Sequence, residues 1–402
     1  MLTPSSPTPT KFDFADTATA FEGLSDAELQ KAYWLFGMMN KPWLVNIGTT
    51  WLSRMFNWGL PLDWTVKATI FAQFCGGEDI NECEKVVQKL GQYHIGSILD
   101  YSVEGEDTEE AFDACLAELK RVVQKAAGNK DIPFAVFKVT GLVDSSLLTK
   151  AQAGQPLTAS EQTLLDRGLG RTKELCKLAH DNKVRIFIDA EESWIQDQID
   201  SWALQMMQLY NQDFAIVYNT YQMYRHASIQ NLKQHISQAQ QQGYFFGAKI
   251  VRGAYMETER RKATEGGYPD PIQPNKQATD RDYDKALMLC LDNIHLVSFC
   301  AGTHNEASTK LLALELDNRG LNYSDGRVWF SQLLGMSDNI SHSLAKAGYN
   351  VVKYVPYGPV RSVVPYLSRR AKENTAIAGQ TSREFGLIVT ELRRRRQAKR
   401  QR

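Results

Sequence analysis

The sequence feature that most constrains the fold is a series of eight short apolar segments, separated by stretches with helical periodicity. Several segments are continuous apolar runs, which is typical of parallel strands buried on both faces. Eight strand-then-helix units in one chain predict an α/β protein built as a (β/α)8 barrel. The predicted strands are Gly96–Tyr101, Pro133–Val139, Val184–Ile188, Phe214–Tyr218, Phe245–Val251, His295–Cys300, Arg327–Leu333 and Asn350–Val355.

An open, doubly wound sheet is the alternative fold, and such sheets often carry a glycine-rich phosphate-binding turn after a strand. No G-x-G-x-x-G follows any predicted strand, and the sequence has no G-x-x-x-x-G-K-[ST]. Gly168-Leu169-Gly170 follows helical sequence and lacks the third glycine. The barrel is therefore the favoured prediction.

The chain before the first predicted strand has helical periodicity and no strand-like alternation. Ser25-Asp26-Ala27-Glu28 matches a capping box, which marks the start of a helix. We expect a disordered segment at residues 1–10 and an N-terminal helical region at residues 11–94. A catalytic barrel at residues 95–381 and a C-terminal helix with a basic tail at residues 382–402 complete the predicted organisation.

The charges balance at 46 basic and 46 acidic residues, so the composition indicates no general affinity for nucleic acid. Residues 393–402 are rich in Arg and Lys and contain no acid. A solvated tail is the commoner fate of such a run, and contact with an anionic membrane or nucleic acid is the alternative.

The cysteines and the N-terminus bear on the compartment. The six cysteines form no C-x-x-C pair, which predicts reduced thiols. The chain has no apolar run of about 18 residues, and residues 1–10 match no signal or transit peptide. We therefore expect a bacterial cytoplasmic protein, and leave open whether it lies at the periphery of the inner membrane.

Polar residues stand at nearly every predicted strand end, which is where barrel enzymes place their active sites. Many of them are cations, and this excess suggests an anionic cofactor together with an anionic substrate. The residues at or just beyond the strand ends are Asp100, Ser102, Lys138, Asp189, Glu191, Asn219, Gln222, Lys249, Arg252, Tyr255, Thr303, His304, Asn305, Gln332 and Tyr354.

A helix predicted after the last strand presents a second charged cluster. Tyr366, Arg369, Arg370 and Glu373 have the spacing i, i+3, i+4 and i+7, which places them on one helix face. Guanidinium groups bind carboxylates and phosphates in bidentate fashion, so this face is a candidate anion site. A solvated face with an ion pair is the alternative.

Other chemistries have weaker support. None of the seven histidines has the spacing of a metal ligand pair. A Schiff-base mechanism would use Lys138 or Lys249 as the nucleophile, but it leaves the paired arginines unexplained. No G-x-S-x-G indicates a serine nucleophile.

Four stretches together closely resemble the proline dehydrogenase family: Ile188–Glu192, Lys249–Tyr255, Gly302–Asn305 and Tyr354–Asn374. The resemblance extends over nearly the whole chain and is strongest to the monofunctional, mitochondrial-type branch. It implies a distorted (β/α)8 barrel with non-covalent FAD at its mouth and the last helix lying over the top. The implied reaction is oxidation of L-proline to Δ1-pyrroline-5-carboxylate, with hydride passing from proline C5 to flavin N5 and electrons then passing to a membrane quinone.

The resemblance also implies a role for individual residues. Arg369 and Arg370 would clamp the proline carboxylate, and Glu373 would hold that clamp through an Arg and Lys138. An ion pair between Lys138 and Asp189 would lie beside the substrate ring and the flavin. The residues implied to wall the ring are Tyr354, Tyr366, Leu333, Ala254 and Tyr255. The residues implied to bind FAD are Gln222, Lys249, Arg252, Gly253, Lys276, Thr303, His304, Asn305 and Glu191.

Two other functions stay open from the sequence. A hydroxyproline dehydrogenase of the same fold is one, although the phenol of Tyr354 would leave little room for a 4-hydroxyl group. The other is a non-enzymatic barrel whose basic tail binds nucleic acid or an anionic membrane; the favoured hypothesis expects no nucleic-acid partner. Structural alternatives also stay open for single residues: Asp189 and Glu191 as helix N-caps, Lys276 as a surface residue in a loop.

Overall fold

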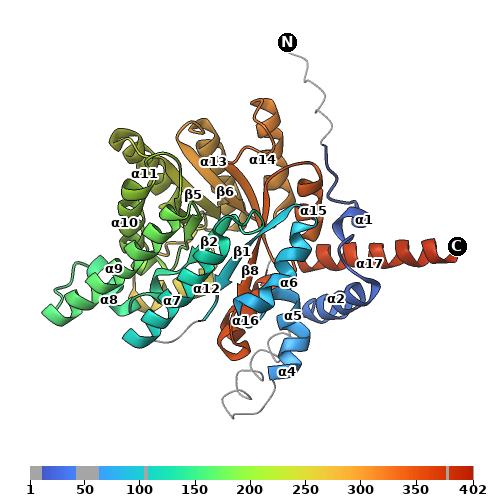
Figure 1. Ribbon diagram of the computed structural model, residues 1–402, viewed down its shortest axis with the longest axis horizontal. Coiled ribbons are helices and arrows are strands. Elements are labelled where there is room, and N and C mark those ends of the chain that lie inside the picture. The colour runs from blue at the N-terminus through green and yellow to red at the C-terminus, as the bar shows by residue number, and fades with distance from the viewer. Residues whose placement is uncertain (1–10, 42–62, 104–106, 377–379, 402) are drawn as a thin grey trace.

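Eight parallel strands form a closed barrel in the part of the chain that the computed structural model describes, residues 11–41, 63–103, 107–376 and 380–401. For residues 63, 65, 370–376 and 380–382 this description covers the backbone alone. Each strand pairs with the next along the sequence, and the last pairs with the first (Figure 1). The predicted (β/α)8 barrel is confirmed. The strands are β1 (Ile95–Tyr101), β2 (Phe134–Phe137), β3 (Arg185–Ile188), β4 (Val217–Gln222), β5 (Phe246–Val251), β6 (Val297–Gly302), β7 (Val328–Leu333) and β8 (Val351–Tyr357).

The fourth strand lies later in the sequence than predicted. The prediction placed it at Phe214–Tyr218, but β4 begins at Val217 and runs to Gln222. The side chain of Asn211 accepts hydrogen bonds from the amides of Ile216 and Val217, which holds the preceding residues in a turn. The polar residues predicted to follow this strand therefore lie within it.

Helices surround the barrel and precede it. Before β1 come α1 (Thr17–Ala20), α2 (Asp26–Met39), α4 (Asp63–Val66), the π-helical turn η1 (Lys67–Phe71), α5 (Ala72–Phe74) and α6 (Ile80–Gly91). Between the strands lie α7 (Glu109–Ala126), the 3-10 turn η2 (Val139–Gly141), α8 (Ser145–Gln152), α9 (Ala159–Asp181), α10 (Ser193–Tyr210), α11 (Ser228–Gln242), α12 (Met256–Gly266), α13 (Lys276–Asp292), α14 (Glu306–Asn318) and α15 (Asp338–Lys346). After β8 come α16 (Val360–Ala376) and α17 (Gln380–Arg400).

The helix α2 begins where the sequence predicted. Ser25 accepts a hydrogen bond from the amide of Glu28, and the Glu28 carboxylate accepts one from the amide of Ser25. This reciprocal pair satisfies two amides that the first helical turn leaves without partners. Residues 1–10, predicted to be disordered, lie outside the described residues, and the division of the chain into domains stays a prediction.

Aromatic side chains fill the interior of the barrel. The rings of Phe134 and Phe187 stack with centroids 4.4 Å apart, and Tyr218 meets both edge-on. Arg185, at the first position of β3, lies over the rings of Phe134 and Trp329. The packed rings occupy the interior of the barrel. Polar side chains gather at the carboxyl ends of the strands.

The C-terminal helix α17 packs against the N-terminal helices. Leu387 and Ile388 of α17 are buried in one apolar cluster with Leu29 and Phe36 of α2. The same cluster includes Leu367 of α16, so the helix after β8 is held between the barrel and the outer helices.

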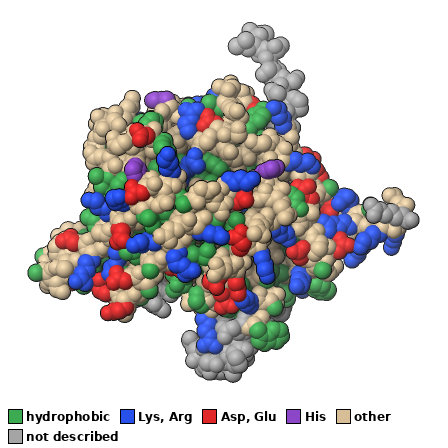
Figure 2. All heavy atoms as spheres, viewed as in Figure 1, with side chains coloured by type: hydrophobic (Ala, Val, Ile, Leu, Met, Phe, Trp, Pro, Cys, Tyr) green, Lys and Arg blue, Asp and Glu red, His purple; other side chains and the backbone are tan. Residues whose placement is uncertain are grey.

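The basic run at the end of the chain is helical to Arg400 and not frayed, and most of its side chains are exposed, as predicted for a solvated run. Arg395 pairs with Glu391 of its own helix and with Asp26 of α2, and Lys399 also pairs with Asp26. Lys and Arg side chains line this end of α17 (Figure 2). Among the described helices, none combines the length and the apolar character needed to cross a membrane.

Candidate active site

Asp189 is the centre of a hydrogen-bonded charge cluster at the carboxyl ends of the strands. It directly follows β3 and is 8% exposed. Its carboxylate accepts hydrogen bonds from Lys249 Nζ at 2.6 Å and from Tyr354 Oη at 2.8 Å. Lys138 Nζ lies 3.8 Å away. Side chains from the ends of β2, β3, β5 and β8 therefore meet at one carboxylate.

The charges of this cluster keep Asp189 ionised. Burial alone raises the pKa of the Asp189 carboxyl, but the ammonium groups of Lys249 and Lys138 outweigh it. The pKa therefore lies below its usual value. Burial, followed by the neighbouring carboxylates of Asp100 and Asp189, raises the pKa of Tyr354 well above its usual value. The phenol therefore stays protonated and donates a hydrogen bond to Asp189.

Lys138 lies between two carboxylates. Its Nζ is 3.8 Å from Asp100 Oδ1 in β1 and 3.8 Å from Asp189 Oδ2. The predicted pair of Lys138 with Asp189 is thus a longer contact than that of Lys249 with Asp189. The sequence assigned Lys249 to the flavin and did not predict its bond to Asp189.

Arg252 is the centre of a second group, which joins β5 to α13 and α14. Its guanidinium donates to Asp280 at 2.8 Å, to Thr303 Oγ1 at 2.6 Å and to Ser308 Oγ at 2.9 Å. It also lies over the ring of Tyr283, 4.2 Å from the centroid. These bonds fix the guanidinium beside the N-terminus of α14.

The turn that leads from β6 into α14 brings three predicted residues together. Thr303 Oγ1 accepts from the amide of Asn305 at 3.0 Å, and Asn305 caps α14 by accepting from the amide of Ser308 at 3.1 Å. His304 Nδ1 lies 2.9 Å from Ser337 Oγ. A helix N-terminus beside an arginine is electropositive and suits a phosphate group.

Gln222 and Gly253 shape the loops between these two groups. Gln222 donates to the carbonyl of Glu191 at 2.7 Å and accepts from the amide of Ala254 at 3.1 Å, so it ties the loop after β3 to the loop after β5. Gly253 has φ +134, and a Cβ there would lie 2.4 Å from the ring of Tyr224. Only glycine fits this position.

Glu191 is buried, and its carboxylate accepts hydrogen bonds from the amide and the hydroxyl of Thr140. Burial raises its pKa to about 7. The alternative that Glu191 caps the next helix has no support, because Glu259 of α12 accepts from the Ser193 amide at the start of α10, at 2.6 Å.

The remaining predicted residues are placed as follows. Tyr366 of α16 is buried, and Leu333, Tyr255 and Arg369 are half-buried. Arg370 and Glu373 lie on α16, but their side chains are outside the described part of the structure. Lys276 begins α13 and is not in a loop as predicted; its exposed ammonium pairs with Asp280 and so meets Arg252 only through that carboxylate.

Sequence reasoning missed several partners that hold these residues. Thr140, Asp280, Ser308 and Ser337 each bond a predicted site residue. Asp280 and Ser308 lie on helices away from the strand ends and carry no sequence signal. Thr140 and Ser337 follow the ends of β2 and β7 by a few residues, and a wider search beyond those strands would have found them.

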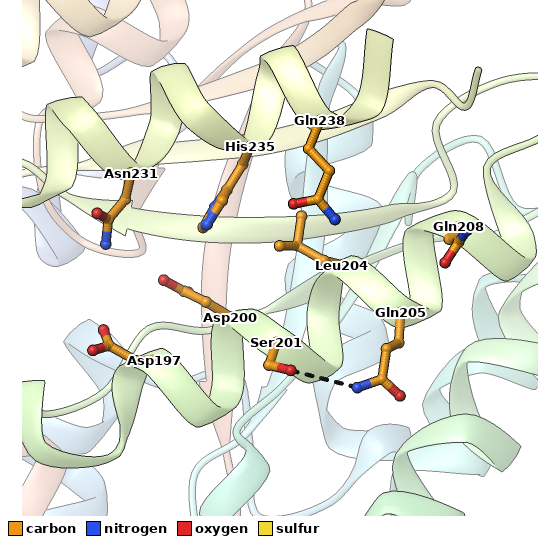
Figure 3. A pocket seen from close by; sticks show the side chains of 9 residues that line it. All are labelled: Asp197, Asp200, Ser201, Leu204, Gln205, Gln208, Asn231, His235 and Gln238. Atoms are coloured by element: carbon orange, nitrogen blue, oxygen red, sulfur yellow. Dashed lines mark hydrogen bonds between the residues drawn. The ribbon is translucent and has the colours of Figure 1, made fainter. Parts of the chain in front are cut away.

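A groove of about 440 Å³ lies between α10 and α11, on the outer layer of helices (Figure 3). Asp200, Asn231 and His235 are among the polar side chains that line it. Asp200 is buried and accepts from Gln196 and Asn219. The residues lining this groove belong to the two helices, so it is separate from the strand-end cluster.

The closed barrel and the charge cluster at its strand ends define the class of this protein, a (β/α)8-barrel enzyme with paired charged side chains at the barrel mouth. Residues 83–383 match the family model described as proline dehydrogenase. The chain belongs to the proline dehydrogenase family.

Two relatives and one solved structure show the range of this similarity. The chain is 35% identical over 326 residues to proline dehydrogenase 1, mitochondrial, of Drosophila melanogaster, covering 75% of this chain and 48% of that protein. It is 31% identical over 419 residues to hydroxyproline dehydrogenase of Xenopus laevis, covering 93% of this chain and 88% of that protein. The chain thus spans about half the length of the Drosophila protein. The crystal structure of proline utilization A from Bdellovibrio bacteriovorus has a TM-score of 0.68 at 20% identity, covers 91% of this chain and 37% of that one, and supports the fold alone.

Proposed function

We propose that the chain is an FAD-dependent proline dehydrogenase that oxidises L-proline to Δ1-pyrroline-5-carboxylate. The observation that carries this proposal is the cluster of Lys138, Asp189, Lys249 and Tyr354 at the carboxyl ends of the strands, in a chain of this family. The cluster is buried, polar and held together from four strands, as a preorganised site requires.

The residues around Arg252 fit a non-covalent FAD. The guanidinium and the N-terminus of α14 supply positive charge and amide donors for a pyrophosphate. Gly253 lacks a Cβ, which would clash with the ring of Tyr224, so the loop after β5 can pack closely against that ring beside the proposed cofactor site. When bound, the flavin supplies at N5 the acceptor for the hydride that leaves proline C5. The residues that would hold it are Gln222, Glu191, Lys249, Arg252, Gly253, Lys276, Thr303, His304 and Asn305.

Arg369 and Arg370 bind the proline carboxylate in this proposal, and Glu373 holds them in place. Both arginines lie on α16, which follows β8 directly and so starts at the barrel mouth. A guanidinium pair provides bidentate hydrogen bonds that fix the orientation of the substrate ring. The residues that wall the ring and exclude water are Tyr354, Tyr366, Leu333, Ala254 and Tyr255.

The amine of proline must be neutral before hydride leaves C5. Asp189 is bound by Lys249 and Tyr354, and its low pKa makes it a poor proton acceptor. The ammonium and guanidinium groups of the site disfavour a positive charge on the substrate nitrogen, so they lower the pKa of the bound amine. The site thus promotes the reactive form of proline without a dedicated base.

The proposal includes a membrane quinone as the final electron acceptor. It follows from the family resemblance and implies contact with a membrane, in line with our hypothesis of a cytoplasmic protein at the periphery of the inner membrane. Reoxidation of the proline-reduced enzyme by a soluble quinone analogue, measured against reoxidation by oxygen, tests this part separately.

Hydroxyproline is the second candidate substrate, because the Xenopus hydroxyproline dehydrogenase and this chain match over most of both lengths. Tyr354 argues against it. The phenol is buried and pinned by its 2.8 Å bond to Asp189, so it cannot swing aside for a 4-hydroxyl group.

The decisive experiment is an anaerobic titration of the purified, FAD-loaded protein, followed by the visible flavin absorbance. L-proline should bleach the flavin band, and trans-4-hydroxyproline should bleach it far more weakly. Bleaching by hydroxyproline alone would favour the second candidate. A protein that binds no FAD would refute the proposed function.

A further inference from the structure

Ser337 connects the cofactor side of the barrel to the C-terminal helix. It directly precedes α15, makes no side-chain capping bond to that helix, and is 2% exposed. Its hydroxyl lies 2.9 Å from His304 Nδ1, in the turn after β6. Its backbone amide donates to the carboxylate of Glu384 on α17. One residue therefore contacts both a proposed FAD ligand and a helix that begins more than forty residues later in the sequence.

The backbone of Ser337 is held in a conformation that serine rarely adopts. Its φ of +52 and ψ of 43 lie in the left-handed region. Such a conformation is strained for a residue with a side chain and persists only where the surroundings fix it. The Glu384 carboxylate binds the amide, and Ser341 Oγ donates to the carbonyl of Ser337 at 3.2 Å. A charged acceptor makes the stronger of these two contacts.

Glu384 is itself fixed by its surroundings. It is 5% exposed, and its neighbours on the sequence anchor the helix to the same region: Arg383 pairs with Glu306, the first residue of α14, at 3.0 Å. Asp338 in the first turn of α15 pairs with the buried Lys353 of β8 at 2.8 Å. A buried carboxylate is costly to place beside another carboxylate, so its position at Ser337 needs a reason beyond helix packing.

We infer that Glu384 is a positioning residue for the cofactor site. Its carboxylate fixes the Ser337 amide, Ser337 in turn orients the ring of His304, and FAD affinity depends on the start of α17. This inference rests on the proposed function, because it assigns His304 to the FAD site.

Glu391 is a matched comparison on the same helix. It is 0% exposed and binds Arg394 and Arg395, so it also supports the docking of α17. It lies two helical turns from Glu384 and contacts neither Ser337 nor α15 in the described structure. If the only effect of a substitution is to loosen α17, substitutions at Glu384 and at Glu391 should have the same effect on FAD binding.

The experiment uses the full chain and four variants: Glu384→Ala, Glu384→Gln, Ser337→Ala and Glu391→Ala. The first readout is the His304 ring signal in NMR spectra of the cofactor-free protein labelled with 13C-histidine, assigned by its loss in His304→Gln. The second readout is the Kd for FAD. Thermal unfolding of each variant separates general destabilisation from these effects.

Glu384→Ala and Ser337→Ala should shift the His304 signal and weaken FAD binding by about tenfold, the effect of one lost charge-assisted contact. Glu384→Gln keeps an oxygen acceptor for the Ser337 amide and should restore both readouts. Glu391→Ala should lower the unfolding temperature while its FAD affinity and His304 signal stay near those of the wild type.

Two results would overturn this inference but not the proposed function. One is an unchanged His304 signal in Glu384→Ala, and the other is an equal loss of FAD affinity in Glu384→Ala and Glu391→Ala. If Glu384→Ala does not fold, an unchanged His304 signal and FAD affinity in Ser337→Ala would overturn it. A wild-type protein without FAD binding would overturn the proposed function and this inference together.

Discussion

Lys249 Nζ lies 2.6 Å from Asp189 Oδ1, and both side chains are about nine-tenths buried. The two residues come from the ends of β5 and β3 and are far apart in the sequence. Two opposite charges in a buried site stabilise each other only as long as both remain. The pair is therefore a preorganised part of the site, and the loss of either partner should destabilise the folded protein.

Asp189→Ala should lower the free energy of unfolding by about 3–5 kcal/mol, because it leaves the ammonium of Lys249 buried without its carboxylate. Urea denaturation followed by circular dichroism measures this loss. Asp181→Ala removes the partner of Lys177 in an exposed pair of α9 and is the control. That substitution should change the free energy of unfolding little, because solvent screens an exposed pair. Equal losses in the two variants would show that the buried pair contributes no more to stability than the exposed pair.

Arg369→Ala should raise the KM for L-proline by about 10- to 100-fold, which corresponds to the loss of a hydrogen bond to a charged group. Steady-state kinetics with a dye acceptor provide the measurement. Arg361→Ala changes an exposed arginine of the same helix and should leave KM unchanged. A KM for proline that stays at the wild-type value in Arg369→Ala would exclude Arg369 from the carboxylate clamp.

Tyr354→Ser should shift the preference of the enzyme toward trans-4-hydroxyproline. It removes the ring that lies beside the substrate in the proposed site, and the space left can hold a 4-hydroxyl group. The ratio of kcat/KM for hydroxyproline to that for proline should rise. Tyr354→Phe keeps the ring but removes the 2.8 Å bond to Asp189 that holds it, so this ratio should rise far less than in Tyr354→Ser. If the serine variant leaves the ratio unchanged, Tyr354 does not set the substrate preference.

Gly335→Ala should destabilise the protein more than Gly320→Ala. Both glycines have positive φ, so alanine is strained at either position by about 1–2 kcal/mol. At Gly320 a new Cβ would meet nothing within 4 Å in the described structure, whereas at Gly335 it would lie 2.1 Å from the carbonyl oxygen of Gln73. The thermal midpoints of the two variants test this difference. Similar midpoints would mean that the segment of Gln73 moves aside freely.

The barrel was predictable because its strands are apolar runs bounded by polar residues and helical periodicity. β1 and β5 begin within a residue of the predicted positions. The position of β4 was not predictable, because Asn219, Thr220 and Gln222 place polar side chains inside the strand. An apolar pattern marks a strand that is buried among apolar neighbours, and it fails where the strand itself carries polar groups of the site.

The site was only partly predictable for a related reason. A sequence shows which residue ends a strand, so Asp189, Lys249 and Tyr354 could be placed at the same rim. It does not show which of two lysines lies closer to a carboxylate, since that depends on side-chain direction. The contact between Ser337 and Glu384 could not be predicted, because it depends on where the last helix returns to the barrel.

The pH dependence of stability should reveal Glu384, whose pKa is raised to about 7 by burial and by the neighbouring Asp338. A carboxyl with a raised pKa stabilises the fold fully below its ordinary pKa of 4.5, and this stability is lost as the pH rises through about 7. A shift of this size corresponds to about 3 kcal/mol. Glu384→Gln cannot ionise, so its free energy of unfolding should gain on that of the wild type between pH 5 and pH 8, measured by urea denaturation at about those values.

Glu391→Gln should show the opposite trend. Burial raises the pKa of Glu391, but hydrogen bonds from Arg394 and Arg395 outweigh burial, and the pKa lies below its usual value. A carboxyl with a lowered pKa contributes stability above its ordinary pKa, and that stability is lost as the pH falls. The glutamine variant should therefore fall behind the wild type as the pH rises toward 4.5, and the difference should stay constant above that pH. If both variants changed in the same direction with pH, Glu384 would not be the group that titrates near neutrality.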